Sequence, residues 1–436
     1  MNAQYDAVVV GAGFAGITAA RDLVDQGRSV VVLEAGTRIG GRTYARPFAG
    51  YEHITAELGG SWVNRELQPA VRQEIERYGS QLVEDLPCEN AVFFSAGQRR
   101  AFPVPAAELA DLERVIGHMR DVSKRIAPSQ RLSSQPIRDL DISAEDFIAP
   151  LDLGPATREL FYATVAWYTG AEPTKVSVLG TLAQIAGFGH SPFGFYGALT
   201  ERFVGGAGTL LDAIVRDSGL EIRLEHTVAS VDVRDGEVTV RTISNDTVRA
   251  RSCVVAVPTN VLRNIAFTPS LPPEKSRFLT KNHLGRAYKP SMLVRNIPRR
   301  SFAFGSGKLQ ALCLGYEYED GSCLIMGFGD ENSVADPTSR EELEAAVREY
   351  YPDADVIAVD AHDWNSDPLF DGTYRIDRPG EAYDFLRAMN VPEGPVVFAG
   401  TDIDDSIWRI WIEGAISSGH RAAGAVSRLL HSRTGT

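Results

Sequence analysis

The sequence predicts a mixed α/β protein in which a Rossmann-like dinucleotide-binding domain is interleaved with a second domain. Three observations favour this fold class. A strand, a glycine-rich turn, a helix and a second strand open the chain, and a buried strand followed by a long helix closes it. Between the two ends, helical and strand-like stretches alternate without a low-complexity linker. The domains are therefore expected to share the chain in several segments rather than to follow one another.

Length, charge and cysteine content argue against several other classes. The 436 residues exceed what one simple core accommodates. The 57 acidic and 44 basic residues give a net charge of −13, opposite to that of a nucleic-acid-binding surface. Four scattered cysteines and the lack of an HExxH pair argue against a disulfide framework and a metal site. No apolar run is long enough to span a membrane and no secretory signal opens the chain, so we expect a cytoplasmic protein.

The N-terminal segment reads as one βαβ unit. Tyr5-Asp-Ala-Val-Val-Val10 is a short β-branched run, Ile17 to Gln26 has helical composition, and Ser29-Val-Val-Val-Leu-Glu34 is a second apolar run. Gly27 ends the helix. Nearly continuous apolar strands are typical of a parallel sheet that is covered on both faces.

The next region, from about Leu67 to Gly187, is expected to be mostly helical. Apolar residues recur at helical spacing in three stretches, and prolines separate them. These stretches are Ala70–Tyr78, Ala106–Ile126 and Pro155–Ala166.

The rest of the chain is expected to contain more strands than helices. Short alternating runs, punctuated by Asp235-Gly236 and Asn245-Asp246, predict a β-meander over 220–257. Further strands are expected in 286–330 and 354–364, a helix that opens at Thr338 over 338–350, a strand at 395–400 and a long helix at 412–430.

The glycine turn between the first strand and the helix carries the first chemical signal. Its sequence, Gly11-Ala-Gly-Phe-Ala-Gly16, fits the G-x-G-x-x-G fingerprint of dinucleotide binding. Gly11 permits the tight turn, Gly13 lets the backbone approach a pyrophosphate, and Gly16 lets the helix and strand pack closely. Glu34, at the end of the second strand, can accept hydrogen bonds from both adenosine ribose hydroxyls and would repel a 2′-phosphate.

This fingerprint does not separate FAD from NAD, but the segment after it is more specific. Arg38-Ile-Gly-Gly-Arg-Thr43 resembles the second flavin-binding signature of the flavin-containing monoamine oxidase family, in which the arginine equivalent to Arg42 neutralises the pyrophosphate. Further stretches resemble the same family in matching order. They are Glu57-Leu-Gly-Gly-Ser-Trp62, Thr227-Val228, Leu284-Gly-Arg-Ala-Tyr-Lys289, Gly400-Thr-Asp402 and Trp411-Ile-Glu-Gly-Ala415.

Within the family, the chain most resembles bacterial amine oxidases of the 6-hydroxynicotine oxidase type. The resemblance implies a Rossmann-like FAD-binding domain of the amine oxidase type with an interleaved substrate-binding domain. The implied FAD-binding segments are 1–75, 198–285 and 391–436, and the implied substrate-domain segments are 76–197, largely helical, and 286–390.

The resemblance also implies how FAD is held. Gly59 to Trp62 would run along the flavin ring, Val228 would hold the adenine through its backbone, and Asp402 would bind the ribitol, although relatives carry glutamate there. The N-terminus of the last helix would face the N1–C2=O edge of the flavin. The residues implied to bind FAD are Gly11, Gly13, Phe14, Ala15, Gly16, Glu34, Ala35, Gly36, Arg42, Gly59, Gly60, Ser61, Trp62, Val228, Trp364, Asp402, Ile412 and Ala415.

Three residues are implied to carry the chemistry. Lys289 would hold a water against flavin N5, and Tyr374 and Trp411 would form the two walls of an aromatic cage. Trp411 stands where many relatives have tyrosine, which predicts a differently shaped substrate. Thr373 occupies the position where some relatives attach the flavin through a cysteine, so the FAD is expected to be non-covalent.

The implied reaction is oxidation of a C–N bond in a small alkyl or heterocyclic amine. Hydride would pass to flavin N5, the imine or iminium product would be hydrolysed, and O2 would be reduced to hydrogen peroxide. Two alternatives stay open, a flavin-dependent C–C desaturase and an amine dehydrogenase with a protein electron acceptor. The expected partners are the amine and O2, with neither nucleic acid nor membrane. The oligomeric state is left open, a homodimer among the options.

Overall fold

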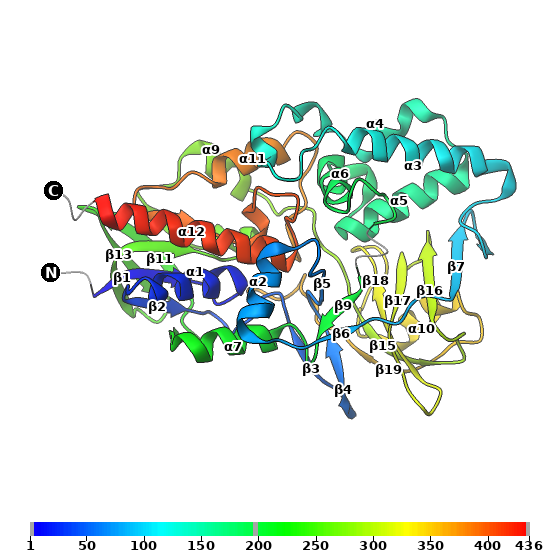
Figure 1. The fold of residues 1–436 in the computed structure, drawn as a ribbon, viewed down its shortest axis with the longest axis horizontal. Helices are drawn as coiled ribbons and strands as arrows, with labels where there is room; N and C mark the ends of the chain where they lie inside the picture. Colours follow the sequence, from blue (N-terminus) through cyan, green and yellow to red (C-terminus); the bar gives the residue numbers. More distant parts are fainter. Residues whose placement is uncertain (1–3, 195–198, 433–436) are drawn as a thin grey trace.

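The computed structural model describes residues 4–194 and 199–432. Two sheets with helices packed on them form the molecule, and the N-terminal and C-terminal ends of the described chain lie on the same side (Figure 1). This arrangement is the expected mixed α/β fold. None of the described helices is long and apolar enough to cross a membrane.

The larger sheet contains eight strands in the order β10-β2-β1-β13-β12-β11-β14, with β20 paired to β13. β1 lies parallel to both β2 and β13, and β20 also runs parallel to β13, whereas β11, β12 and β13 form an antiparallel meander. The strands are β1 (Tyr5–Val10), β2 (Val30–Leu33), β10 (Glu221–Arg223), β11 (Val228–Arg234), β12 (Glu237–Thr242), β13 (Thr247–Val255), β14 (Ala266–Thr268) and β20 (Val396–Phe398).

The second sheet contains seven strands in the order β19-β15-β18-β17-β16-β7-β8. It is antiparallel except where β7 pairs parallel to β16. The strands are β7 (Asn90–Ser95), β8 (Gln98–Arg100), β15 (Ser291–Arg295), β16 (Ser301–Gly305), β17 (Ala311–Glu317), β18 (Cys323–Phe328) and β19 (Asp355–Asp360). Two small sheets join β3 (Ala45–Phe48) to β4 (Tyr51–Glu57), and β5 (Trp62–Val63) and β6 (Leu82–Glu84) to β9 (Glu201–Phe203).

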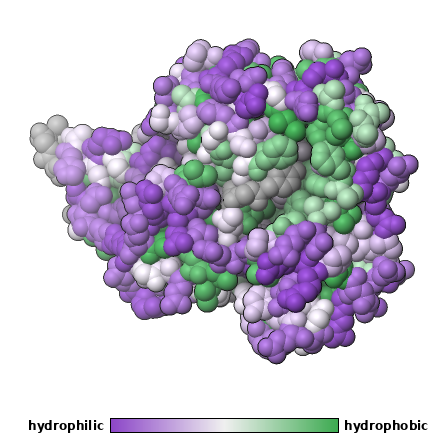
Figure 2. Space-filling model, turned by 45° about the vertical axis from the view of Figure 1, so that its right-hand side comes forward, coloured by the Kyte–Doolittle hydropathy of each residue, from purple (hydrophilic) through white to green (hydrophobic). Residues whose placement is uncertain are grey.

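The helices form two groups. α1 (Phe14–Asp25) and α12 (Ile412–Ser432) lie side by side against the large sheet, with α2 (Pro69–Tyr78) and α7 (Gly208–Ser218) beside them (Figure 1). α3 (Leu109–Ser123), α4 (Ala144–Ile148), α5 (Pro155–Thr169) and α6 (Val178–Gly187) gather at the other end of the molecule. Apolar side chains collect in the middle of the face that Figure 2 shows, and hydrophilic ones surround them. The shorter helices are α8 (Thr259–Leu262), α9 (Pro273–Ser276), α10 (Arg340–Arg348) and α11 (Ala382–Met389).

Close packing of α1 on α12 depends on a small residue in α12. A Cβ on Gly419 would lie 2.6 Å from the carbonyl oxygen of Ala15 and 2.8 Å from the Cβ of Thr18. A larger side chain would therefore push the two helices apart. Apolar residues of α1 and α12 share one buried cluster with the central strands of the large sheet.

The structure adds detail to one expectation and corrects another. The stretch from Leu67 to Gly187 is mostly helical, as expected, but it also holds β6, β7 and β8. β7 finds its parallel partner β16 about 200 residues away, and local periodicity does not report a partner so distant. The helix expected to open at Thr338 begins at Arg340, because the Ser339 hydroxyl caps it by accepting from the Glu342 N–H at 3.3 Å.

The strands of the large sheet come from residues 5–33, 221–268 and 396–398, and those of the second sheet from 90–100 and 291–360. The small three-stranded sheet pairs Glu201–Phe203 with both Trp62–Val63 and Leu82–Glu84, and its strands belong to neither large sheet. The five-segment division into domains stays a prediction.

A charged cluster connects α12 to α1 and α2. His420 Nδ1 lies 2.6 Å from an Asp22 oxygen and His420 Nε2 lies 3.5 Å from a Glu74 oxygen. Arg21 forms an ion pair with Glu74 at 2.6 Å. Burial alone would lower the pKa of His420, but the carboxylates of Asp22 and Glu74 raise it to about 9.

This raised pKa predicts a pH-dependent stability. In the unfolded chain the pKa of histidine is about 6.5, so the stabilisation by His420 is complete below that pH and is lost as the pH rises through 9. We expect His420→Gln to be less stable than the parent at pH 6, and the difference to shrink by about 1–2 kcal/mol at pH 9.5, a value discounted for solvent screening. Chemical unfolding of both proteins at the two pH values measures this, and a difference that does not change with pH would contradict it.

Candidate active site

A cavity of about 350 Å³ lies where the two halves of the fold meet. The ends of β1 and β2 and the first residues of α1 and α12 line one part of it. Side chains of α5, α6 and β18 line another part. In parallel α/β sheets, ligands bind at the carboxyl ends of the strands, so the cavity occupies the expected position.

The glycine turn forms the floor of the nucleotide end. Gly11 has a φ of +102°, in the region that favours glycine. A Cβ on Gly16 would lie 1.9 Å from the Gly11 carbonyl oxygen, whereas one on Gly13 would meet no atom within 4 Å. α1 has no side-chain cap at its N-terminus, so its first N–H groups are free for a ligand.

Glu34 lies at the end of β2 and lines the cavity. One of its oxygens accepts from the Ala12 N–H at 2.7 Å and the other accepts from the Gly36 N–H at 2.8 Å. Each carboxylate oxygen has a further lone pair available. The side chain is therefore fixed in place and can still accept hydrogen bonds from two hydroxyl groups.

Arg38 organises the loop that contains Arg42. Its guanidinium donates to the carbonyl oxygens of Ile39, Gly41 and Thr43, at 3.1, 2.8 and 3.3 Å, and lies over the Tyr44 ring at 4.0 Å. Burial lowers the pKa of Arg38, although it stays protonated at any physiological pH. The bent loop directs Gly40, Gly41, Arg42 and Thr43 to the cavity.

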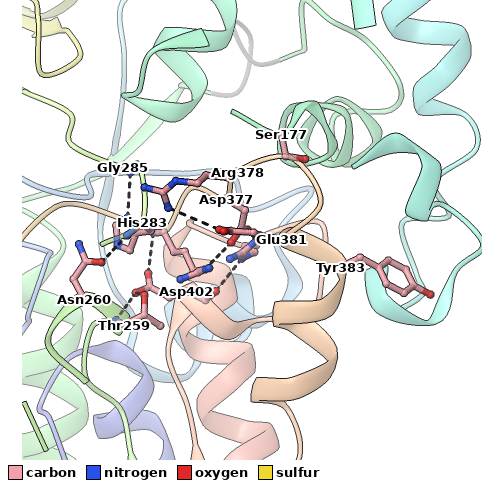
Figure 3. A network of polar contacts seen from close by, with 12 residues as sticks. Ser177, Thr259, Asn260, His283, Gly285, Asp377, Arg378, Glu381, Tyr383 and Asp402 are labelled. Atoms are coloured by element: carbon pink, nitrogen blue, oxygen red, sulfur yellow. Dashed lines mark hydrogen bonds and ion pairs between the residues drawn. The ribbon is translucent and has the colours of Figure 1, made fainter. Parts of the chain in front are cut away.

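Asp402 does not line the cavity, and it lies next to Thr259 (Figure 3). It accepts from Arg42 Nη1 at 2.7 Å, from the Thr259 N–H at 3.0 Å and from the Thr259 hydroxyl at 3.1 Å. Burial alone would raise the pKa of Asp402, but the charge of Arg42 holds it well below its usual range. Asp402 therefore positions Arg42, and its contact with the ribitol stays a prediction.

Buried polar groups surround Asp402. The His283 ring accepts from the Gly285 N–H at 3.1 Å, and the backbone N–H of His283 donates to the Asn260 side-chain oxygen at 2.9 Å. Burial lowers the pKa of the His283 ring to about 3. Arg375 donates to Asp377 at 2.6 Å. The neutral His283 ring and the Arg375–Asp377 pair form a rigid polar network around Asp402. Through Asp402, this network supports the loop that contains Arg42.

Lys289 lies at the opposite end of the cavity. Its ammonium donates to the Gly59 carbonyl at 2.7 Å and to the Ser61 hydroxyl at 2.5 Å, and it lies 4.6 Å from the Trp62 ring centroid. Desolvation lowers the pKa of Lys289 to about 8, against the opposing charge of Glu57. One of its three N–H groups remains for a water or a ligand.

Aromatic side chains enclose this end of the cavity. Tyr374 and Trp411 both line it, and burial raises the pKa of the Tyr374 hydroxyl above its usual range. The Trp62 indole donates to Asp85 at 2.6 Å and the Trp364 indole donates to the Leu58 carbonyl at 2.8 Å. Their ring orientations are thus fixed by hydrogen bonds as well as by packing.

The backbone before Trp411 is strained. Ile410 has a φ of +74°, a left-handed conformation that a β-branched residue rarely adopts and that costs about 1–3 kcal/mol. The Trp411 carbonyl accepts from the Thr401 hydroxyl at 2.9 Å and from the Ala415 N–H at 3.2 Å. α12 then begins at Ile412, and its first turn lines the cavity through Ile412 and Ala415.

Most of the residues expected from the sequence line this one cavity. Three do not, because Gly16 packs against Gly11, Gly36 donates its N–H to Glu34, and Asp402 supports Arg42. The expected residues that line it are Gly11, Gly13, Phe14, Ala15, Glu34, Ala35, Arg42, Gly59, Gly60, Ser61, Trp62, Val228, Lys289, Trp364, Tyr374, Trp411, Ile412 and Ala415.

Sequence reasoning missed several lining residues near Lys289. These are Trp167, Tyr168, Gln184, Leu199 and Phe328. Trp167 and Tyr168 lie in α5, beyond the expected helix end at Ala166, and Phe328 ends β18. Each belongs to an apolar stretch that reads as ordinary core, so no motif distinguishes them.

The geometry fits a flavin dinucleotide. The open space at Gly13, the uncapped N-terminus of α1 and the guanidinium of Arg42 suit a pyrophosphate. The N-termini of two helices, α1 and α12, meet at the same cavity, which favours negative charge at two places. The aromatic end with Lys289 suits a planar ring system.

Comparisons with known proteins agree with this geometry. Residues 14–427 match the family model described as flavin containing amine oxidoreductase. The chain is 32% identical to (S)-6-hydroxynicotine oxidase of Paenarthrobacter nicotinovorans, over 98% of this chain and 100% of that protein. It is 31% identical to nicotine dehydrogenase of Pseudomonas putida, over 98% of this chain and 89% of that protein.

Solved structures share the fold. A putrescine oxidase bound to putrescine has a TM-score of 0.85 at 24% identity, covering 97% of this chain and 99% of its own. Cyclohexylamine oxidase from Brevibacterium oxydans has a TM-score of 0.85 at 22% identity, covering 98% of this chain and 99% of its own.

The open space at Gly13 generates a prediction. We expect Gly13→Val to retain less than about a tenth of the flavin bound by the parent, because the new side chain fills the place of the pyrophosphate. Gly208→Val, at the start of α7 with similarly open surroundings, should keep its flavin. Flavin absorbance per chain and the unfolding temperature of each flavin-free protein are measured, and full flavin content in Gly13→Val would refute the assignment.

Proposed function

Because the chain belongs to the flavin-containing amine oxidoreductase family, we propose that it oxidises a C–N bond of a small amine with non-covalent FAD. One observation carries this proposal. Lys289 and the aromatic walls Tyr374 and Trp411 share a single cavity with the nucleotide-binding turn. A hydride acceptor bound in the turn can thus reach an amine held between the walls.

FAD would be held by residues from three distant parts of the chain. The first turn of α1 and Arg42 would bind the pyrophosphate, and Glu34 would bind the adenosine ribose. Asp402 would act on the pyrophosphate through Arg42. Thr373 lines the cavity where a thiol would be needed for attachment, which supports a non-covalent cofactor.

When bound, FAD accepts a hydride equivalent from the carbon beside the amine nitrogen and then passes the electrons to O2 as hydrogen peroxide. The chain supplies position rather than a base. Tyr374 and Trp411 would exclude water and align the amine, whose nitrogen must be neutral for its lone pair to drive the transfer. The rate should therefore rise with pH through the pKa of the substrate amine.

Lys289 would hold a water near the flavin ring. Two of its N–H groups already bind Gly59 and Ser61, which leaves one directed to a water. A pKa near 8 lets the ammonium exchange a proton close to neutral pH. This water could add to the iminium product or assist the reaction with O2.

The similar proteins suggest the class of amine and the electron acceptor. We propose an alkyl or heterocyclic amine because (S)-6-hydroxynicotine oxidase and cyclohexylamine oxidase are among the similar proteins. We propose O2 as the acceptor, with a protein acceptor as the second candidate because nicotine dehydrogenase is also similar. A C–C desaturase is not favoured, since the relatives that show the family are amine oxidases and dehydrogenases.

A panel of amines tests the function. The purified yellow protein is mixed without oxygen with heterocyclic, cyclic and linear amines, and loss of flavin absorbance is followed. We expect at least one amine to bleach the flavin, and admitted air to restore the colour with peroxide formed in equal amount. Bleaching without recovery in air would favour the protein acceptor, and persistent colour with every amine would refute amine oxidation.

The position of Lys289 generates a second prediction. Lys289→Met should keep FAD but slow flavin reoxidation by O2 about a hundredfold, because the held water and its proton source are lost. Lys281→Met is the control, since Lys281 is exposed and pairs with Glu381. Stopped-flow reoxidation measures both, and an unchanged rate in Lys289→Met would remove Lys289 from the mechanism.

A further inference from the structure

We propose that Gln184 of α6 is a positioning residue that holds the Trp411 indole in the orientation required for amine oxidation. The proposal rests on the proposed function, in which Trp411 is one wall of the amine site. It adds a residue of the second domain to that site, one that no motif indicates.

A hydrogen bond connects the two residues. The Trp411 indole N–H donates to Gln184 Oε1 at 3.2 Å. Gln184 is buried, with 3% of its surface exposed, and it lines the cavity beside Trp411. In such surroundings an indole N–H without an acceptor is costly, so the bond favours one ring orientation over others.

The residue that caps the C-terminus of α6 supports the same ring. Phe188 directly follows α6, four residues after Gln184, and residues so spaced on a helix lie on one side of it. The Phe188 ring lies 5.7 Å from the Trp411 ring, at an interplanar angle of 73°. α6 therefore presents an acceptor to the indole N–H and a ring to its face or edge.

Residues outside α6 hold the backbone of Trp411. Ile410 fixes the entry of the chain in its left-handed conformation, and Thr401 donates to the Trp411 carbonyl at 2.9 Å. These groups determine where the side chain starts but not how the ring is rotated. Gln184 adds a polar constraint on the rotation of the ring, beside the packing of Phe188 and Trp408.

Gln184 and Ile410 also border a small second cavity of about 40 Å³, lined further by Arg375, Asp377 and Arg409. This space lies next to the residues that hold the wall, so they have room to relax when the hydrogen bond is lost. Loss of the hydrogen bond should therefore change the shape of the amine site while the fold is kept.

A double-mutant cycle tests the proposal. Gln184→Leu should lower the ratio of the flavin reduction rate constant to the amine dissociation constant about tenfold in the parent, because Trp411 loses its acceptor. In a Trp411→Phe background, which has no indole N–H, the same change should lower it less than about twofold. Equal losses in the two backgrounds, or no loss in the parent, would overturn the proposal. Equal losses would indicate that Gln184 contacts the amine directly.

Further variants keep the test decisive. If Gln184→Leu does not fold, Gln184→Met replaces it, because methionine has a length similar to glutamine and also lacks the acceptor. Gln184→Glu keeps an acceptor oxygen and should therefore restore most of the ratio that Gln184→Leu loses. Gln135→Met is the matched control, because Gln135 is similarly buried and its side chain bonds to the backbone of Ala127 and Gln130, which do not line the cavity. Its kinetic constants should stay within about twofold of the parent.

A measurement without turnover separates this proposal from the proposed function. In protein labelled with ¹⁵N-tryptophan, the Trp411 indole N–H signal is assigned by its loss in Trp411→Phe. Gln184→Leu should shift that signal and leave the other indole signals in place. An unshifted signal would refute the hydrogen bond even if the parent oxidises amines. A shifted signal in a protein that oxidises none would refute the function instead.

Discussion

The site depends on the close contact between α1 and α12. Gly419 lets the two helices approach until the backbone of Ala15 lies against α12. This contact places two helix N-termini at one cavity, although the helices come from opposite ends of the sequence. Each N-terminus carries partial positive charge, and together they favour a ligand with negative charge at two separated positions. A dinucleotide with an electron-accepting ring has this distribution.

Polar groups hold the two cationic side chains that face the cavity, Arg42 and Lys289. Asp402 is buried and holds Arg42, so the guanidinium that faces the cavity is fixed before any ligand arrives. Lys289 is fixed in a similar way by Gly59 and Ser61. Groups held in place in advance lose little conformational freedom on binding, which strengthens each interaction with a ligand. The aromatic walls keep bulk water away from the ammonium and thereby lower its pKa.

The sequence alone predicts most of the residues that line the cavity near the glycine turn, and only part of those that line it near Lys289. The glycine turn, Glu34 and Arg42 lie within short motifs whose spacing dictates their geometry, and Lys289, Tyr374 and Trp411 follow from resemblance. Gln184 and Phe328 could not be predicted, because each lies in an apolar element and reaches the site only through long-range packing. The pairing of Asp402 with Arg42 could not be predicted from the sequence either. Its partner Arg42 is remote in sequence, and only the folded chain reveals that the two side chains meet.

The order of segments along the chain has a consequence for biogenesis. β20 pairs with β13, and α12 covers α1, so the final 41 residues complete a cradle begun by the first 34. Those residues are synthesised after the N-terminal unit, so the apolar surface of that unit stays exposed to solvent until they emerge from the ribosome. The cavity is thus complete only after α12 has been synthesised, and a chain that stops before α12 would lack the first helical turn that lines it.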